Sequence, residues 1–363
     1  MWRTAKVSTS RDRGASRALF ANIRGMKNVF GMSRGELESE LVAAGSPRFR
    51  GGQIYRSIYA RGAQSFEEMT ELSRQLRERL SRNYVIRRPR VRDRSLSKDG
   101  TRKFLIELED KRQVETVYIP DGERHTFCLS TQVGCPLKCT FCFSGTVRFE
   151  RNLTPGEIVG QFLLAREELA SPPARSNIVF MGMGEPLLNV EGVDGSLEIL
   201  SDDKACAVSP RRITVSTAGL PDELERFAIG HPAVGLAISL HATRNGHRSR
   251  IMPINRTHPL EELLAVARRL PLSRRRRITF EYVLLGGEND TQADAQRLAS
   301  LLEGMNVKVN LIPYNPWPGS PHLRTTREAA ESFMRILATV GITVSLRKSR
   351  GDDVLAACGQ LAG

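Results

Sequence analysis

The chain lacks a hydrophobic run long enough to cross a membrane, and its first residues lack the apolar segment of a secretion signal. These two absences predict a cytoplasmic protein with no membrane partner. Cysteine is also scarce, with 6 among 363 residues. In a chain that is not exported, cysteines are more typical of metal binding or catalysis than of a disulfide framework.

Acidic residues are too few to balance the basic ones: 40 Asp and Glu stand against 54 Lys and Arg, which gives a net charge of +14. Such an excess favours a polyanionic partner, with nucleic acid first. Residues 1–32 contain a single acid, Asp12, and we predict a basic, disordered extension there. The alternatives for these residues are an organelle import signal, or a translation start at Met26 or Met32.

Four further segments follow the extension. The sequence SRGE at residues 33–36 is a capping box and begins a small helical domain that we place at 33–83. Residues 84–124 are predicted to form a linker and an adapter, with basic residues 87–98 as the linker and a β-hairpin after them. We expect the main domain at 125–350 and a C-terminal loop at 351–363.

The main domain alternates short β-branched apolar runs with helical stretches. This pattern predicts an α/β fold with parallel strands, either an open sheet or a partial barrel. Polar motifs come directly after successive strands, for example GMGEP after the second strand and STAG after the third. Because the carboxyl ends of parallel strands meet at one edge, we expect the functional site there.

Four of the six cysteines fall within residues 128–142. Cys135, Cys139 and Cys142 have the spacing C-x3-C-x2-C, which can hold three corners of an iron–sulfur cubane and leave its fourth iron open. A closed zinc site normally has four ligands in two separated pairs, and no second C-x2-C pair exists here. Zinc with Cys128 as the fourth ligand is the alternative.

Longer motifs make a resemblance specific. The cysteine spacing, with Phe141 before its last member, is similar to that of the radical S-adenosylmethionine superfamily. The segments GMGEPLLN, VSTAGL, SLHATRNGHRSRIMPIN, NLIPYNPWPG and RGDDVLAACGQLAG resemble the RNA adenine-C2 methyltransferases that act on 23S rRNA and tRNA. The match runs from about residue 33 to the end. It departs from the family at residues 143–149, after the cysteines.

The resemblance implies a partial (β/α)6-type barrel with a [4Fe-4S] cluster on Cys135, Cys139 and Cys142. It also implies two molecules of S-adenosylmethionine for each methyl transfer, and a reduced donor such as flavodoxin or ferredoxin. Residues at successive strand ends would bind S-adenosylmethionine: Gly184, Glu185, Ser216, Ser239, Leu240, His241 and Asn315. The helical domain and the linker arginines would dock RNA, and the protein would act as a monomer.

Three residues would handle the methyl group itself. By resemblance, Cys358 carries it as S-methylcysteine, and Cys128 releases the product by forming a disulfide with Cys358. Glu115 matches the family's proton acceptor, while Cys206 matches nothing and is expected to be structural.

Two rival functions stay open. One is a methyltransferase of the antibiotic-resistance branch, which modifies adenine C8. The other is a non-catalytic RNA-binding protein with structural zinc.

Overall fold

The structure is a computed structural model that describes residues 26–271 and 276–363. The chain divides after Arg88 into two compact units. Each unit has a hydrophobic core of its own. Among the described residues, no helix is long and apolar enough to cross a membrane.

The first unit is mainly helical. Its helices are α1 (Arg34–Ala43), α2 (Phe49–Tyr59) and α3 (Arg74–Asn83), and two short parallel strands, β1 (Lys27–Asn28) and β2 (Tyr84–Val85), join its ends. The predicted capping box is present, because the side chains of Ser33 and Glu36 each accept from the other's backbone.

The boundary predicted for the N-terminal extension is too late. Within the supposedly disordered residues 1–32, the last seven are ordered: β1 pairs with β2, and Val29 and Phe30 are buried. The rest of the predicted extension, residues 1–25, lies outside the described part of the chain.

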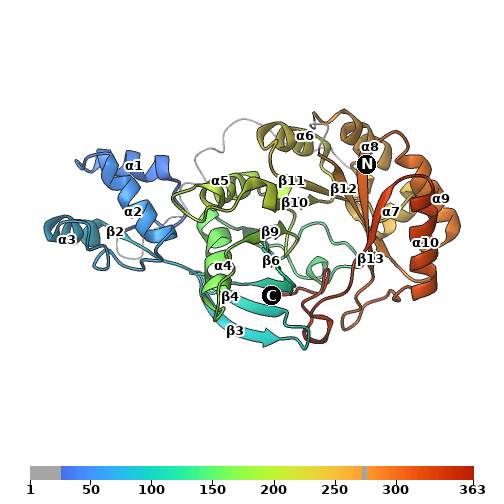
Figure 1. Cartoon of the computed structure of the whole chain (residues 1–363), viewed down its shortest axis with the longest axis horizontal. Coiled ribbons are helices and arrows are strands. Elements are labelled where there is room, and N and C mark those ends of the chain that lie inside the picture. Colours follow the sequence, from blue (N-terminus) through green and yellow to red (C-terminus); the bar gives the residue numbers. More distant parts are fainter. Residues whose placement is uncertain (1–25, 272–275) are drawn as a thin grey trace, which may run out of the picture. The chain divides into compact units, whose positions relative to one another are not determined.

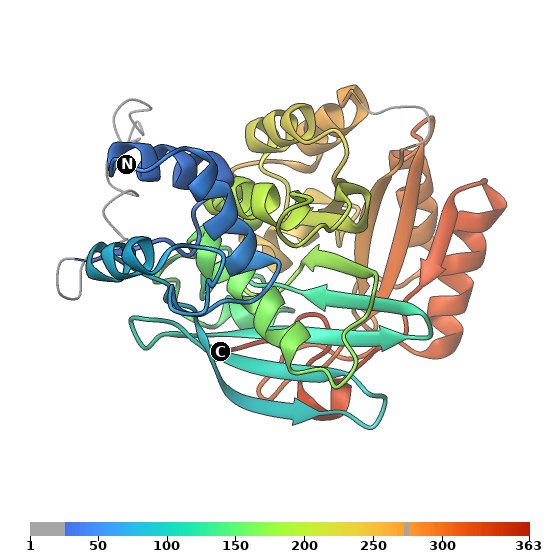
Figure 2. The ribbon, with the colours of Figure 1, turned by 60° about the vertical axis from the view of Figure 1, so that its left-hand side comes forward.

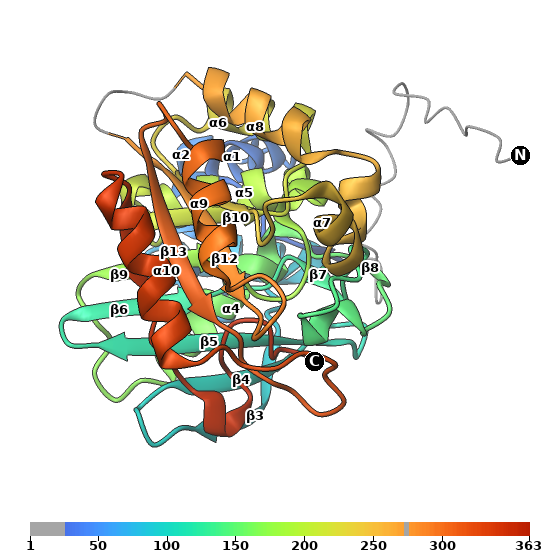
Figure 3. The same cartoon turned by 90° about the vertical axis from the view of Figure 1, so that its right-hand side faces the viewer.

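The second unit is built on a ten-stranded sheet (Figures 1 and 3). Seven strands are parallel, and three antiparallel strands extend the sheet beyond β6. In sheet order they are β14 (Thr343–Leu346), β13 (Val307–Pro313), β12 (Ile278–Leu284), β11 (Gly235–Ser239), β10 (Ile213–Thr217), β9 (Ser176–Phe180), β6 (Arg124–Cys128), β5 (Gln113–Asp121), β4 (Arg102–Glu107) and β3 (Arg90–Leu96). The α/β class with a mostly parallel sheet is therefore confirmed.

The segment predicted as a linker is partly a strand. Residues 90–96 form β3, the outer strand of the antiparallel part, which Figure 2 shows beside β4 and β5 (teal strands). The predicted two-stranded hairpin is consequently a three-stranded extension of the main sheet.

Helices connect the parallel strands: α4 (Pro155–Glu167), α5 (Val190–Ser201), α6 (Pro221–Gly230), α7 (Asn245–Ile251), α8 (Leu260–Arg269), α9 (Gln292–Leu301) and α10 (Arg327–Thr339). Helix α4 begins with Thr154 as N-cap, Pro155 in the first turn and Glu157 completing a capping box. The short strands β7 (Gln132–Val133) and β8 (Arg151–Asn152) flank the cysteine loop and pair with each other. This pairing closes the loop at its base.

Candidate active site

One cavity lies at the carboxyl ends of the parallel strands. Its walls come from the cysteine loop after β6, from β9 to β13 and the segments that follow them, from Arg347 just after β14, and from the C-terminal loop. It brings together ten of the predicted residues: Cys135, Cys139, Cys142, Gly184, Glu185, Ser216, Ser239, His241, Asn315 and Cys358. The predicted residues Leu240, Cys128 and Glu115 do not line it.

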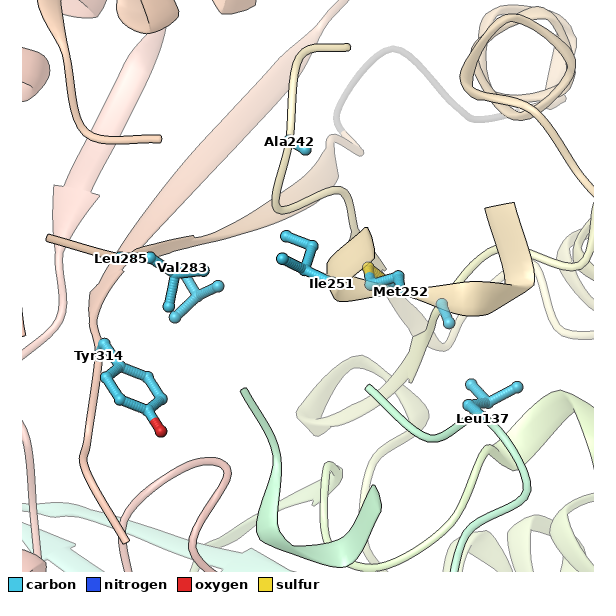
Figure 4. Close-up of a cluster of buried hydrophobic side chains, with 8 residues drawn as sticks. Leu137, Ala242, Ile251, Met252, Val283, Leu285 and Tyr314 are labelled. Carbon is cyan, nitrogen blue, oxygen red and sulfur yellow. The ribbon is translucent and has the colours of Figure 1, made fainter. Parts of the chain in front are cut away.

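An apolar cluster supports the cysteine loop. Leu137, on the loop itself, is buried with residues from α7, β12 and the segment after β13, among them Ile251, Val283 and Tyr314 (Figure 4). Cys135 and Cys139 pack against this cluster. Gly145 is needed where the loop turns back, because a Cβ there would come within 2.6 Å of the Cys139 carbonyl oxygen. The thiols are thus held by packing rather than by a regular element.

The three thiols of the loop interact with one another. Burial raises the pKa of Cys135 to about 12 and also raises the pKa values of Cys139 and Cys142, and the neighbouring thiols add to the increase. Among the described residues, no three His, Cys, Asp or Glu side chains are placed to hold a single metal ion. Three soft sulfur donors around one cavity fit an iron–sulfur cluster, which is larger than an ion.

Glu185 is buried and fixed at the same cavity. Its carboxylate accepts from the backbone N–H groups of Leu187 (3.1 Å) and Ala218 (2.8 Å). Burial raises its pKa to about 7, although these hydrogen bonds act in the opposite direction. Gly184 has a φ of 99°, and a Cβ at that position would meet the Gln132 side chain at 2.6 Å. Glycine is therefore required before Glu185.

His241 is neutral in the folded protein. Its Nδ1 accepts from the Val283 backbone N–H at 3.0 Å, so the proton of the neutral ring lies on Nε2. Burial lowers its pKa to about 3, and the nearby Arg248 guanidinium adds to this effect. Its ring contacts Phe141 of the cysteine loop edge to face, with centroids 4.8 Å apart.

Arg248 of α7 joins several segments of the site, a role that was not predicted from the sequence. Its side chain is completely buried and donates to the carbonyl oxygens of Ala218 (2.7 Å), Ser239 (3.0 Å) and Leu240 (3.0 Å). It also donates to Asn255 Oδ1 at 3.0 Å. One guanidinium therefore joins the ends of β10 and β11. The role of Leu240 in the described structure is to supply one of these carbonyl groups.

Asn315 holds the loop that carries Cys358. Its Nδ2 donates to the Cys358 carbonyl oxygen at 3.1 Å, while its Oδ1 accepts from Arg324 and Ser349. On the other side of the loop, the Phe143 backbone N–H donates to the carbonyl oxygen of the next residue, Gly359, at 2.7 Å. Cys358 itself is exposed.

Cys128 and Glu115 are buried and do not line the cavity. Cys128 is buried at the end of β6, and burial raises its pKa to about 12, with the Cys358 sulfur as the second cause. Glu115 of β5 forms an ion pair with Lys103 at 2.9 Å and accepts from the Ala362 backbone N–H at 2.8 Å. Cys128 is thus an electrostatic neighbour of Cys358, and Glu115 anchors the C-terminal segment.

Two family models match this chain. Residues 129–299 match the family model of the radical SAM superfamily, and residues 27–86 match that of the ribosomal RNA large subunit methyltransferase N-terminal domain. A solved structure of a radical SAM methyltransferase from Sphaerobacter thermophilus superposes with a TM-score of 0.86. It is 40% identical, with 92% of this chain and 98% of the other covered.

Curated relatives narrow the class to one family. Proteins named dual-specificity RNA methyltransferase RlmN are similar over most of both chains. The relative from Gluconobacter oxydans is 45% identical and covers 93% of this chain and 85% of its own. That from Phenylobacterium zucineum is 46% identical and covers 92% and 90%. The chain belongs to the RlmN family of radical SAM RNA methyltransferases.

This membership confirms the predicted enzyme class and its cofactors, the [4Fe-4S] cluster and S-adenosylmethionine. The roles of individual residues stay predictions. Glu281 and Arg347 also line the cavity and, like Arg248, were not predicted from the sequence. A signal for Glu281 was present, because it is a charged residue inside an apolar strand.

Proposed function

We propose that this protein methylates C2 of an adenosine in 23S rRNA and in tRNA, with Cys358 as the carrier of the methyl group. One observation supports the proposal above others: Cys358 lines the same cavity as the three cysteines of the loop and Glu185. A methyl group on Cys358 would consequently be next to both cofactors.

The cofactors would be held by residues on the cavity wall. Cys135, Cys139 and Cys142 would bind the cluster, and Glu185 would accept from the ammonium group of S-adenosylmethionine. The other predicted binding residues are Gly184, Ser216, Ser239, Leu240, His241 and Asn315. When bound, the two cofactors supply an electron and a radical that can remove hydrogen from an S-methyl group.

The two catalytic thiols would act in sequence. The Cys358 sulfur first takes a methyl group and is later bonded through that carbon to adenine C2. Release requires attack on the Cys358 sulfur by a second thiol, and Cys128 is its electrostatic neighbour. A Cys128–Cys358 disulfide would form in that step, the freed carbon would take a proton, and the one electron left over from the radical addition would pass back to the bound cluster. The sulfurs of Cys358 and Cys128 both interact electrostatically with Arg347 and raise its pKa.

Glu115 is the proposed acceptor of the adenine C2 proton. In the described conformation its carboxylate is engaged by Lys103 and by Ala362. The C-terminal segment must therefore leave Glu115 before that carboxylate can act. The cytoplasmic location, the monomeric state and a flavodoxin or ferredoxin as electron donor belong to the same proposal.

The experiment that tests the function uses an RNA hairpin and anaerobically prepared enzyme. The unchanged protein should place the methyl group on C2, as mass spectrometry of digested RNA would show. Cys128→Ala should accumulate a covalent RNA–protein adduct, seen as an RNase-sensitive band shift on a denaturing gel. Cys358→Ala and the double variant should form none, and Cys206→Ala serves as the control.

Three results would contradict the proposal. A methyl group on C8 would place the protein in the other branch of methyltransferases. Normal turnover by Cys128→Ala would make that thiol a bystander. An adduct that persists without Cys358 would mean that another residue carries the methyl group.

A further inference from the structure

Three neighbouring parallel strands place polar side chains in one row. Glu281 of β12 pairs in register with Asn310 of β13, and Asn310 pairs with Ser345 of β14. The Ser345 hydroxyl donates to Asn310 Oδ1 at 2.6 Å, and Asn310 Nδ2 donates to Glu281 Oε1 at 2.9 Å. This chain of hydrogen bonds fixes the orientation of the Glu281 carboxylate.

The second oxygen of that carboxylate accepts no hydrogen bond from the described residues. Glu281 is 3% exposed and lines the cavity, and within the described part of the chain no donor hydrogen bonds to its Oε2. A buried acceptor without a donor is costly, so such atoms are typical of sites that receive a ligand. The ligand must offer an N–H or O–H group at this place.

Arg347 lines the same cavity beside Glu281. Its Nη1 is 3.8 Å from Glu281 Oε2, which is close enough for charge attraction but too long for a hydrogen bond, and 3.9 Å from Met181 Sδ. Arg347 and Cys358 line the same cavity, and the Cys358 sulfur is the largest cause that raises the pKa of Arg347. One cavity wall therefore presents a thiol, a cationic donor and a carboxylate acceptor.

The edge of adenine next to C2 offers the complementary groups. C2 is bonded to N1, which accepts a hydrogen bond, and N1 is followed by the exocyclic N6 amino group, which donates. We propose that Arg347 donates to N1 and Glu281 Oε2 accepts from N6 of the target adenosine, so that C2 faces Cys358. This inference rests on the proposed function, because only a reaction at C2 requires that orientation.

Arg347 and Glu281 would also select adenine over guanine. Guanine carries a hydrogen on N1 and an oxygen at position 6, so a donor would face Arg347 and an acceptor would face Glu281. Two mismatched hydrogen-bonding groups in a buried site discriminate strongly, because each leaves a polar atom unpaired. Bases that are flipped out of a strand are commonly read in this way.

The test combines altered enzyme with altered RNA. Three hairpins replace the target adenosine with 1-deazaadenosine, which lacks N1, with purine riboside, which lacks the amino group, or with 3-deazaadenosine as the control. Arg347→Met should methylate the adenosine hairpin roughly 10- to 100-fold more slowly, the range expected for loss of a charge-assisted hydrogen bond. The methylation rate of this variant should not fall further on the 1-deazaadenosine hairpin, because the contact with N1 is already absent. Glu281→Gln should methylate the adenosine hairpin more slowly, and its rate should not fall further on the purine riboside hairpin.

Two controls keep the test decisive. Arg335→Met removes an exposed arginine of α10 and should behave like the unchanged protein. Arg347→Lys keeps the charge and should recover part of the rate. Arg347→Met must still acquire the S-methyl group on Cys358, measured by mass spectrometry of the peptide, and must still produce 5′-deoxyadenosine.

The results separate the alternatives. If Arg347→Met and 1-deazaadenosine reduce the methylation rate independently, so that their effects multiply, the Arg347 guanidinium does not contact N1 and the inference is wrong. If either variant loses S-adenosylmethionine binding or Cys358 methylation, the pair serves the cofactor and the inference is also wrong. If the unchanged protein does not methylate C2, the proposed function itself fails.

Discussion

Replacing Arg248 by methionine should destabilise the second unit more than any surface change. The guanidinium donates four hydrogen bonds in a completely buried position, three of them to the carbonyl oxygens of Ala218, Ser239 and Leu240. Methionine fills a similar space but donates nothing. The ends of β10 and β11 would then lose the group that joins them.

The Leu240 carbonyl oxygen also accepts from the Ala242 backbone N–H at 2.8 Å, so the cost comes mainly from the carbonyl oxygens of Ala218 and Ser239. Each buried carbonyl oxygen left without a donor costs roughly 1–3 kcal/mol. Removing a buried positive charge offsets part of this, since burial lowers the pKa of Arg248 to about 10 and shows that the charge is unfavourable there. We expect a net loss of about 3–5 kcal/mol in the free energy of unfolding. At ~2 kcal/mol per M, the urea midpoint falls by about 2 M.

Tryptophan fluorescence can follow this unfolding. Trp317 packs against the apolar cluster of the site, and a Trp2→Phe background leaves it as the only tryptophan. Arg248→Lys should recover only part of the loss, because an ammonium group cannot span acceptors on two strands as a planar guanidinium does. Arg335→Met is the matched control. A midpoint for Arg248→Met within about 0.3 M of the unchanged protein would refute the reasoning.

Three further outcomes are expected. Cys139→Ala should lose iron and 5′-deoxyadenosine formation, and full iron content by elemental analysis would rule out its role as a ligand. RNA affinity should fall steeply with salt because phosphate contacts release counterions; filter binding that hardly changes with salt would contradict this. The pKa of His241 is lowered from 6.5 to about 3, so the unfolded chain takes up a proton that the folded protein does not. The free energy of unfolding should therefore decline as pH falls below 6.5, and this group alone should lower it by about 2 kcal/mol at pH 5. In urea titrations, His241→Asn should lack that part of the decline.

The sequence could predict the residues at the strand ends because strand, polar motif and helix follow one another along the chain. GMGEP and SLHA come directly after buried strands, and parallel pairing brings such positions together. Glu281 and Arg347 could not be placed in the same way. Their relation depends on the register between β12, β13 and β14 and on the path of the chain after β14, which no local pattern determines.

The two errors in boundaries have physical causes as well. β1 is ordered by pairing with β2, which is distant in sequence, so residues 26–32 have no local signal of structure. β3 is largely exposed and carries arginines at positions 90, 92 and 94. A strand without a buried face has no apolar alternation, and its sequence is therefore like that of a basic linker.

The outer strands of the ten-stranded sheet have a consequence for the protein's behaviour at high concentration. An edge strand with free backbone groups is a template on which another chain can add a strand and start aggregation. β3 carries charged side chains along this edge, and the shift in register between Val91 and Asp93 interrupts its regular pairing. At the opposite edge β14 has only four residues. Both edges therefore resist the addition of a foreign strand, which protects a ten-stranded sheet that is not closed on itself.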